Sequence, residues 1–276
     1  MTGKQTSITF KENTQHDIRV LEGNQHDIAL LDRALKELFP PNFPQNEADE
    51  ALSLVEELSS ETPSASGSKF AFLLVGDNLD KDADKATIKG LAIGLLFPKS
   101  RTASTWYIVI DSKYRNGGIF KPLFDKQVST LNDMCQKEKG EDLQAFFLHI
   151  HDPSIKETLS TDPFNPNKRV ALFHHMGFKR VSLSHFFSPL ATEEEDVYDT
   201  SIPYILVAAS IIPGEEVQAS KEAVKGHITD YYIEYGIKNP INHLDYQQMM
   251  LELEALDESN LLAPLLDVDK QMSKKN

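Results

Sequence analysis

The chain contains one cysteine and no long apolar segment, and each scarcity excludes a class of protein. Cys135 alone cannot form an internal disulfide, which fits a reducing compartment. The longest apolar stretches, 90–97 and 204–212, have the length of strands and are far shorter than the roughly 20 residues that cross a bilayer. No apolar signal segment follows Met1, so we expect a cytoplasmic protein without a membrane partner.

Basic residues are also scarce. The chain has 28 lysines and arginines against 42 acidic residues, which gives a formal net charge of −14. Surfaces that bind nucleic acids are basic, so this balance argues against a nucleic-acid partner and is compatible with a cationic substrate such as an amine. The acidic connector 77–87 lacks the features of a calcium loop, because Lys85 and Leu91 occupy the positions of the turn glycine and the bidentate glutamate. We therefore expect no metal.

Hydrophobic periodicity outlines an α+β protein. The spacing predicts helices over 26–39 and 46–60, and a third helix over 119–137 between the strands 104–111 and 145–151. This order of strand, glycine turn, helix and strand predicts a βαβ unit with parallel strands. Alternation along 104–111 predicts that Trp106 and Tyr107 lie on opposite faces of the sheet. The remaining predicted elements are strands over 69–76, 88–97, 178–187 and 203–211, and a short helix over 168–176.

The segment YIVIDSKYRNGGIFKPL (107–123) carries the chemistry. A strand ends, a basic residue and two glycines form a turn, and a helix begins. Successive amides in such a turn converge on one point, and the helix N-terminus adds partial positive charge. This combination suits a pyrophosphate, and the alternative is a structural turn without a ligand.

The same segment resembles the coenzyme A-binding motif of the GNAT superfamily of N-acetyltransferases. The matching residues are Arg115, Asn116, Gly117, Gly118, Ile119 and Phe120. Asn116 replaces the first glycine of the motif and tolerates left-handed backbone angles, whereas Phe120 replaces a small residue. About 50 residues further on, LFHHMGF (172–178) resembles the second motif, which ends in Gly-Phe, with Phe173 in place of its tyrosine.

The resemblance covers roughly 26–212 and implies a fold and an activity. The implied fold is the GNAT fold, a mixed and mostly antiparallel central sheet of about seven strands flanked by helices. The implied activity is transfer of an acetyl group from acetyl-CoA to a primary amine of a small molecule or peptide by direct attack. In this family the pantetheine arm pairs with the strand that includes Val109 and Ile110, and residues 115–120 hold the pyrophosphate.

The resemblance also points to a general base and leaves an alternative open. The position of the glutamate that acts as base in several members is occupied by His149, and His151 lies on the same strand face. Lining of a polar cleft by these two histidines is the other interpretation. Because Phe173 cannot donate a proton to a leaving thiolate, the alternative function is a catalytically degenerate GNAT-fold module that binds an acyl-CoA or a partner.

Residues beyond Pro213 lie outside the resemblance. We divide the chain into a GNAT-like domain, 1–212, and a C-terminal helical extension, 213–276, whose final residues DKQMSKKN we expect to be disordered. The pattern predicts helices over 220–235 and 245–256. We expect their apolar faces to pack on the parent domain. The alternatives are a lid over the acceptor site and a contact between two copies in a homodimer.

Overall fold

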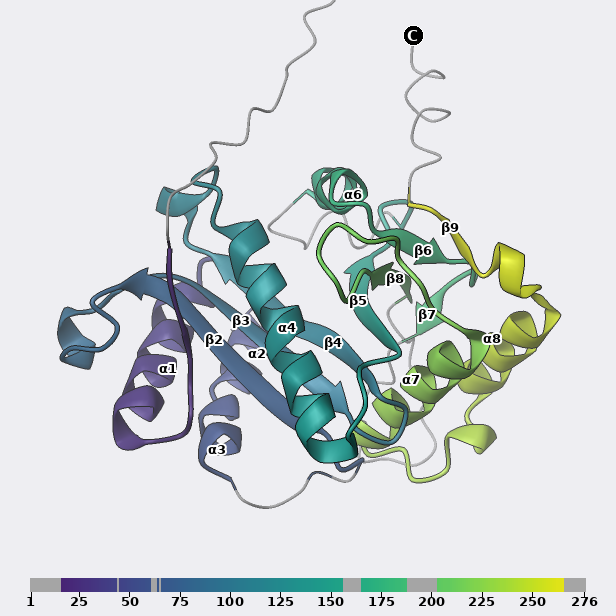
Figure 1. Cartoon of the computed structure of the whole chain (residues 1–276), viewed down its shortest axis with the longest axis horizontal. Helices are drawn as coiled ribbons and strands as arrows, with labels where there is room; N and C mark the ends of the chain where they lie inside the picture. Colours follow the sequence, from purple (N-terminus) through teal and green to yellow (C-terminus); the bar gives the residue numbers. More distant parts are fainter. Residues whose placement is uncertain are drawn as a thin grey trace, which may run out of the picture.

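The apolar segments of the sequence form one mixed sheet with helices on both faces (Figure 1). The computed structural model describes residues 16–43, 45–60, 64, 66–155, 165–187 and 203–265. In spatial order, the strands of this described part are β1 (Asp17–Val20), β2 (Lys69–Asp77), β3 (Thr87–Phe97), β4 (Thr102–Ile110), β5 (Ala145–His151), β8 (Pro203–Ala209), β6 (Lys179–Val181) and β9 (Leu262–Pro264), with β7 (Phe186–Phe187) paired to β8.

The sheet is mostly antiparallel, as predicted, and its described part has nine strands rather than about seven. The two edge strands, β1 and β9, are additional to the predicted set. The segment 178–187, predicted as one strand, forms the two short strands β6 and β7. The β4–β5 pair is parallel, which confirms the predicted βαβ unit.

Helices cover the sheet in three groups. One group is α1 (Gln25–Leu38), α2 (Gln45–Ala51) and α3 (Leu54–Ser59); the second is α4 (Phe120–Lys139) and α6 (Pro166–His175); the third is α7 (Lys221–Glu234) and α8 (Leu244–Ala255). Single 3₁₀ turns are η1 (Ala83–Lys85), η2 (Ser112–Tyr114), η3 (Pro240–Asn242) and η4 (Glu258–Asn260). The predicted helix 46–60 is interrupted at Leu52 and Ser53, where the chain makes i→i+3 bonds instead.

Local signals in the sequence explain where the helices begin and end. Asn24 caps α1 by accepting a hydrogen bond from the Asp27 amide at 3.0 Å. Gly140 ends α4 in the left-handed conformation, with φ of 72°. Asn165 caps α6 by accepting from the amides of Asn167 and Lys168. These caps fix the ends of helices whose apolar sides are buried on the sheet.

The two faces of the sheet bury different helices, as Figure 1 shows. The α4 face packs Leu123, Val128 and Leu131 of α4 and Phe173 of α6 against the sheet. The opposite face, here called the α1/α7 face, is shared: α1 covers β2 and β3, while α7 and α8 cover the half that contains β5 and β8. The C-terminal helices thus pack on the sheet, as the apolar pattern predicts. The last residues of the predicted tail lie outside the described residues.

A β-bulge in β4 corrects one prediction. Thr105 lies opposite Gly94 and Tyr107 lies opposite Ile93, so Trp106 is an extra residue on β4. Because a bulge shifts the alternation of side chains by one residue, Trp106 and Tyr107 both lie on the α1/α7 face, and their predicted placement on opposite faces is wrong.

Candidate functional site

The parallel strands β4 and β5 separate at their carboxyl ends. Their pairing runs from Thr102 with Ala145 to Thr105 with Leu148 and ends there. Beyond that point β4 continues along β3 to Ile110, and β5 continues along β8 to His151. The last β4–β5 pair directly precedes the bulge at Trp106, which increases local twist and explains why the strands diverge. We call this point of separation the fork.

The predicted pyrophosphate turn follows β4 at the fork. The Asp111 carbonyl accepts from the Tyr114 amide at 2.9 Å, and the Tyr114 carbonyl accepts from the Gly117 amide at 3.1 Å. Asn116 and Gly118 have φ of 69° and 75°, which is the left-handed region. The Gly117 amide is therefore used inside the turn.

The other amides around the start of α4, unlike the Gly117 amide, are not used inside the turn. Among the described residues, no acceptor is bonded to the amides of Asn116, Gly118, Ile119, Phe120 or Lys121. The first amides of a helix point along its axis toward the N-terminus, where the helix dipole is positive. The turn and the first turn of α4 therefore form a set of donors suited to an anion.

Basic side chains border these donors. The Arg115 guanidinium donates from Nε to the Ile110 carbonyl at 3.1 Å and from Nη2 to Oδ1 of Asn42. Arg115 thereby joins the end of β4 to the segment after α1. Lys113 is exposed beside it, and Lys121 pairs with Asp125 one helical turn along α4. These positive charges favour binding of a phosphate at the same place.

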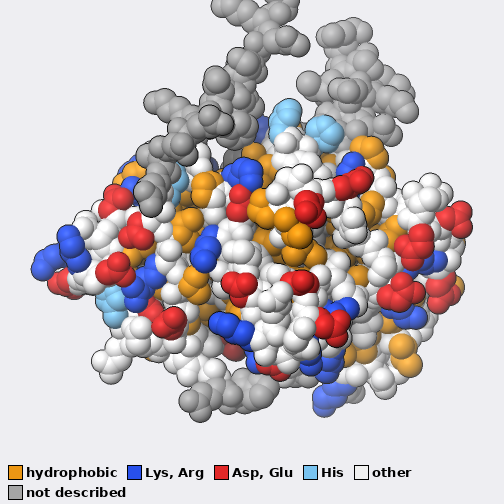
Figure 2. Space-filling model, in the orientation of Figure 1, with side chains coloured by type: hydrophobic (Ala, Val, Ile, Leu, Met, Phe, Trp, Pro, Cys, Tyr) orange, Lys and Arg blue, Asp and Glu red, His pale blue; other side chains and the backbone are white. Residues whose placement is uncertain are grey.

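The ring of Phe120 contacts aromatic side chains of α4 and α6. Its ring is partly buried against Phe124, with centroids 6.1 Å apart, and against Phe173 of α6 at 6.0 Å. Phe173 is buried and stacks on Phe178 at 5.1 Å. Figure 2 shows hydrophobic side chains gathered on this side of the molecule beside α4. The bulky residue at the motif position thus contributes to an apolar wall between α4 and α6.

His149 lies at the fork on the other face. It is the first residue of β5 beyond the pairing with β4. Its ring stacks on Phe186 at 4.3 Å and meets the edge of Tyr231 at 4.4 Å, and its Nε2 lies 3.1 Å from Nε2 of His227. Burial lowers the pKa of His149 to about 3, because removal from water disfavours the imidazolium. His149 is therefore neutral at physiological pH.

His151 points to the same face as His149, as the two-residue spacing predicts. Its ring stacks on Tyr204 of β8 at 5.0 Å and remains partly exposed. The two histidines contact different neighbours, since His149 faces α7 and His151 lies further out along β5. The sequence places both correctly on one face but gives no sign of these contacts.

The sequence analysis does not identify several polar residues that lie near the fork and the turn that follows β4. His227 on α7 is fully buried between β4, β5 and the rings of Phe97 and Phe147. Asn42 follows α1 and contacts Arg115. The one available signal is the stripe 224, 227, 228 and 231 on α7, where a histidine interrupts apolar residues at helical spacing.

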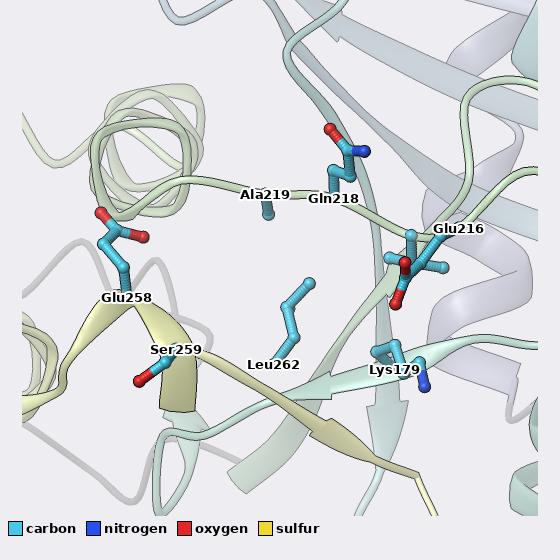
Figure 3. A pocket seen from close by; sticks show the side chains of 8 residues that line it. Lys179, Glu216, Gln218, Ala219, Glu258, Ser259 and Leu262 are labelled. Carbon is cyan, nitrogen blue, oxygen red and sulfur yellow. The ribbon is translucent and has the colours of Figure 1, made fainter.

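The structure contains a cavity elsewhere, of about 440 Å³. It is wide open to solvent and lies between β6, β9 and the segment before α7 (Figure 3). Figure 3 shows Glu216 and Lys179 on one side and Glu258 on the other, with Leu262 between them. Opposed charges around an open apolar centre do not favour one class of ligand.

Two absences, one of a metal site and one of a membrane span, hold for the residues that the structure describes. This part of the chain holds no group of three or more His, Cys, Asp or Glu side chains placed to bind a metal ion. None of its helices combines the length and apolarity needed to span a bilayer.

Comparison with known proteins gives matches at the level of solved structures. No protein-family model matches the chain, and no curated protein matches it by sequence. A candidate acetyltransferase of the GNAT family from Desulfovibrio desulfuricans is 16% identical with a TM-score of 0.46, over 71% of this chain and 99% of that one. A candidate GNAT acetyltransferase from Bacteroides thetaiotaomicron is also 16% identical with a TM-score of 0.46, over 80% and 99%. The ribosomal-protein-S18-alanine N-acetyltransferase of Escherichia coli is 12% identical with a TM-score of 0.42, over 73% and 99%.

Proposed function

We propose that this chain is an acetyl-CoA-dependent N-acetyltransferase that transfers an acetyl group to a primary amine. The observation that carries the proposal is the set of amide donors at the start of α4, which no described residue uses, placed where β4 and β5 separate. Pyrophosphate binding at a helix N-terminus would account for the donors, and the fork would offer a place for an extended pantetheine arm.

The direction of the backbone groups on β4 supports the same placement. The Asp111 amide donates to the Lys89 carbonyl of β3 at 2.9 Å. Because amides of successive strand residues point to opposite sides, the Ile110 amide points away from β3 and toward the side that β5 has left. Val109 and Ile110 thus lie on the strand that would pair with the pantetheine arm. The Ile110 amide is the proposed donor to the oxyanion.

The reaction would proceed by direct attack. The amine nitrogen attacks the thioester carbonyl, a C–N bond forms, the C–S bond breaks, and coenzyme A leaves as the thiol. A primary ammonium with a pKa of about 10.4 must first lose a proton, which costs about 4.6 kcal/mol at pH 7. His149 is the proposed first acceptor of that proton, since it is a titratable side chain on the first residue of β5 beyond the pairing with β4. The net charge of −14 favours a cationic acceptor, either a small molecule or a peptide.

Calorimetric titration with acetyl-CoA and with S-acetylpantetheine tests the binding. We expect acetyl-CoA to bind at least about tenfold more tightly, equivalent to about 1.4 kcal/mol, because only acetyl-CoA carries the pyrophosphate. Equal affinities, or no binding of either compound, contradict the proposed site. Release of thiol from acetyl-CoA in the presence of a panel of polyamines, amino acids and peptides then tests transfer.

Two observations favour the second candidate, an acyl-CoA-binding module without catalysis. Phe173 has no proton to give to a thiolate, and the lowered pKa of His149 weakens that ring as an isolated base. Binding of acetyl-CoA without thiol release on any amine of the panel identifies the module.

A further inference from the structure

A continuous chain of hydrogen-bonding side chains leads from the fork to the turn between β3 and β4. Nε2 of His149 lies 3.1 Å from Nε2 of His227, and Nδ1 of His227 lies 3.2 Å from the hydroxyl of Thr102. The Thr102 hydroxyl lies 2.9 Å from that of Ser100. Asp230 lies at the end of the chain, because its carboxylate accepts from the Ser100 amide at 3.2 Å. The Ser100 hydroxyl lies 3.5 Å from the Phe97 carbonyl and also acts on the Asp230 carboxyl, whose pKa it lowers.

The packing of α7 creates this chain. His227 and Asp230 are buried on α7, and Thr102 is buried at the start of β4. Gly226 lets the helix approach, because a Cβ atom on Gly226 would lie 2.7 Å from the Cβ of Ser100. The residues on α7 come from the C-terminal extension, and the residues that they meet belong to the sheet. The chain therefore exists only when α7 is docked.

The Asp230 end of the chain determines which atom of each hydrogen-bonded pair is the donor. The Phe97 carbonyl and an ionised Asp230 can only accept, so the Ser100 hydroxyl donates toward these groups and accepts from Thr102. Thr102 then accepts from Nδ1 of His227, which leaves Nε2 of His227 to accept from Nε2 of His149. Nδ1 of His149 has no hydrogen-bond partner among the described residues. That nitrogen carries a lone pair at the fork end of the chain.

We propose that these five side chains form a proton relay that carries the proton of the amine acceptor from the fork to the surface. This inference rests on the proposed acetyl transfer. The ammonium gives its proton to Nδ1 of His149; each member passes one proton to the next, and Asp230 becomes protonated. Asp230 then loses the proton to solvent at the partly exposed Ser100. The balance is one ammonium and one acetyl-CoA consumed, and one amide, one thiol and one proton formed.

The surroundings suit a relay better than an isolated base. The rings of Phe186, Tyr231 and Phe147 enclose the two histidines, so neither imidazolium would be solvated. In a relay each ring gains a proton as it loses another, and no charged imidazole accumulates. Lys99 is the charged neighbour that acts on Asp230, whose pKa is raised mainly by burial. A raised pKa lets this carboxyl hold the proton briefly before releasing it.

The pH profile of kcat tests the relay in the full-length chain, with the best amine of the panel as acceptor. His227→Gln keeps polar groups at the position but cannot pass a proton along. We expect kcat at pH 7 to fall about 100-fold, with the KM for acetyl-CoA changed less than about twofold. The deficit should shrink as the pH rises toward the pKa of the amine, about 10.4, because a growing fraction of the amine is then already neutral. His243→Gln is the control, because His243 packs on Tyr232 of α7 outside the chain.

Histidine ¹⁵N NMR gives a readout that does not depend on activity. We expect His149 as the Nε2–H tautomer and His227 as the Nδ1–H tautomer at pH 7. Thr102→Val removes the acceptor of His227 with little change in volume, so the Nδ1–H tautomer of His227 should lose its dominance. Opposite tautomers in the wild type, or no response to Thr102→Val, overturn the relay.

The outcomes separate the two proposals. An active enzyme whose His227→Gln variant keeps the wild-type pH profile overturns the relay and leaves acetyl transfer standing. A chain that binds acetyl-CoA and transfers to no amine at any pH overturns both. The predicted tautomers together with a kcat deficit that shrinks at high pH support both.

Discussion

At the scale of single residues, Gly118 combines two features that the proposed site needs, a left-handed backbone angle and an amide available to a ligand. Its φ of 75° is a conformation that side chains with a Cβ rarely adopt, and its amide has no acceptor among the described residues. Gly140 has nearly the same φ, 72°, but lies at the opposite end of α4. The two glycines, at opposite ends of one helix, therefore share the left-handed backbone conformation and differ in the ligand that we propose.

This contrast gives a matched pair of variants. Gly118→Ala and Gly140→Ala should each lower the free energy of unfolding by about 1 to 2 kcal/mol, because alanine is strained in the left-handed region. Only Gly118→Ala should weaken acetyl-CoA binding, by at least about tenfold. Urea denaturation and calorimetry measure the two effects. Loss of affinity in Gly140→Ala as well would show that the effect is not local to the turn.

The neutral histidine pair predicts how stability depends on pH. The pKa of His149 is about 3 in the folded chain and about 6.5 when unfolded, and the pKa of His227 is lowered in the same direction. The unfolded chain therefore binds more protons below pH 6.5. Stability is complete above that pH and decreases as the pH falls toward 3. The slope is about 1.4 kcal/mol per pH unit for each buried imidazole.

Urea denaturation at several pH values between 5 and 7.5 measures this slope. His149→Gln should flatten it, because the variant has one fewer group that takes up a proton on unfolding. His175→Gln is the control at an exposed position. A wild-type slope that persists unchanged in His149→Gln would mean that folding does not lower the pKa of His149.

At the scale of elements, the closeness of α7 to the β3–β4 turn is the feature that assembles the polar chain. Gly226→Ala should therefore destabilise the protein by about 1 to 3 kcal/mol, since the new methyl group meets Ser100. Alanine in an exposed helical position would instead stabilise by about 1 kcal/mol relative to glycine. Comparing Lys225→Ala with Lys225→Gly, at the exposed neighbouring position, measures that intrinsic preference in the same helix. A stabilising Gly226→Ala would contradict the close approach.

Elements with strong periodicity are the ones that the sequence predicts well. The parallel β4–β5 pair and helix α4 follow from a continuous apolar strand, a glycine turn and an amphipathic run. The edge strand β9 is three residues long and, within the described part of the chain, pairs with β6 alone, so nothing in its local pattern distinguishes it from a loop. The bulge at Trp106 depends on its partner strand β3, and for that reason alternation along β4 misplaces one aromatic ring.

The same distinction applies to the candidate site. The turn 115–120 is visible in the sequence because glycine and asparagine are needed for its backbone angles. The bond of the Gly117 amide to Tyr114 depends on how the turn closes, which composition does not specify. His227 meets His149 across 78 residues of sequence. Contacts of this kind come from the packing of α7, for which the motifs contain no information.

At the scale of the whole molecule, the question is whether the region after residue 212 unfolds with the sheet. Val224, Ile228 and Tyr232 of α7 are buried against residues of β3, β5 and β8, and β9 pairs with β6. A division of the chain at residue 212 predicts two unfolding units, whereas one shared core predicts a single cooperative transition. The helices α7 and α8 lie against the part of the sheet that contains β5 and β8 in Figure 1.

Trp106 makes this question measurable, because it is the single tryptophan of the chain. Its ring lies on β4 and stacks on Tyr235 at the end of α7, with centroids 5.4 Å apart. Tryptophan fluorescence therefore reports the docking of α7, while far-ultraviolet circular dichroism reports the whole fold. We expect the two urea transitions to coincide, because undocking α7 would expose the apolar face of β5 and β8. Tyr235→Leu should alter the fluorescence amplitude and keep the coincidence. A fluorescence change that precedes the loss of circular dichroism would show that the C-terminal region separates first, and the polar chain to Asp230 would then be broken before the fork unfolds.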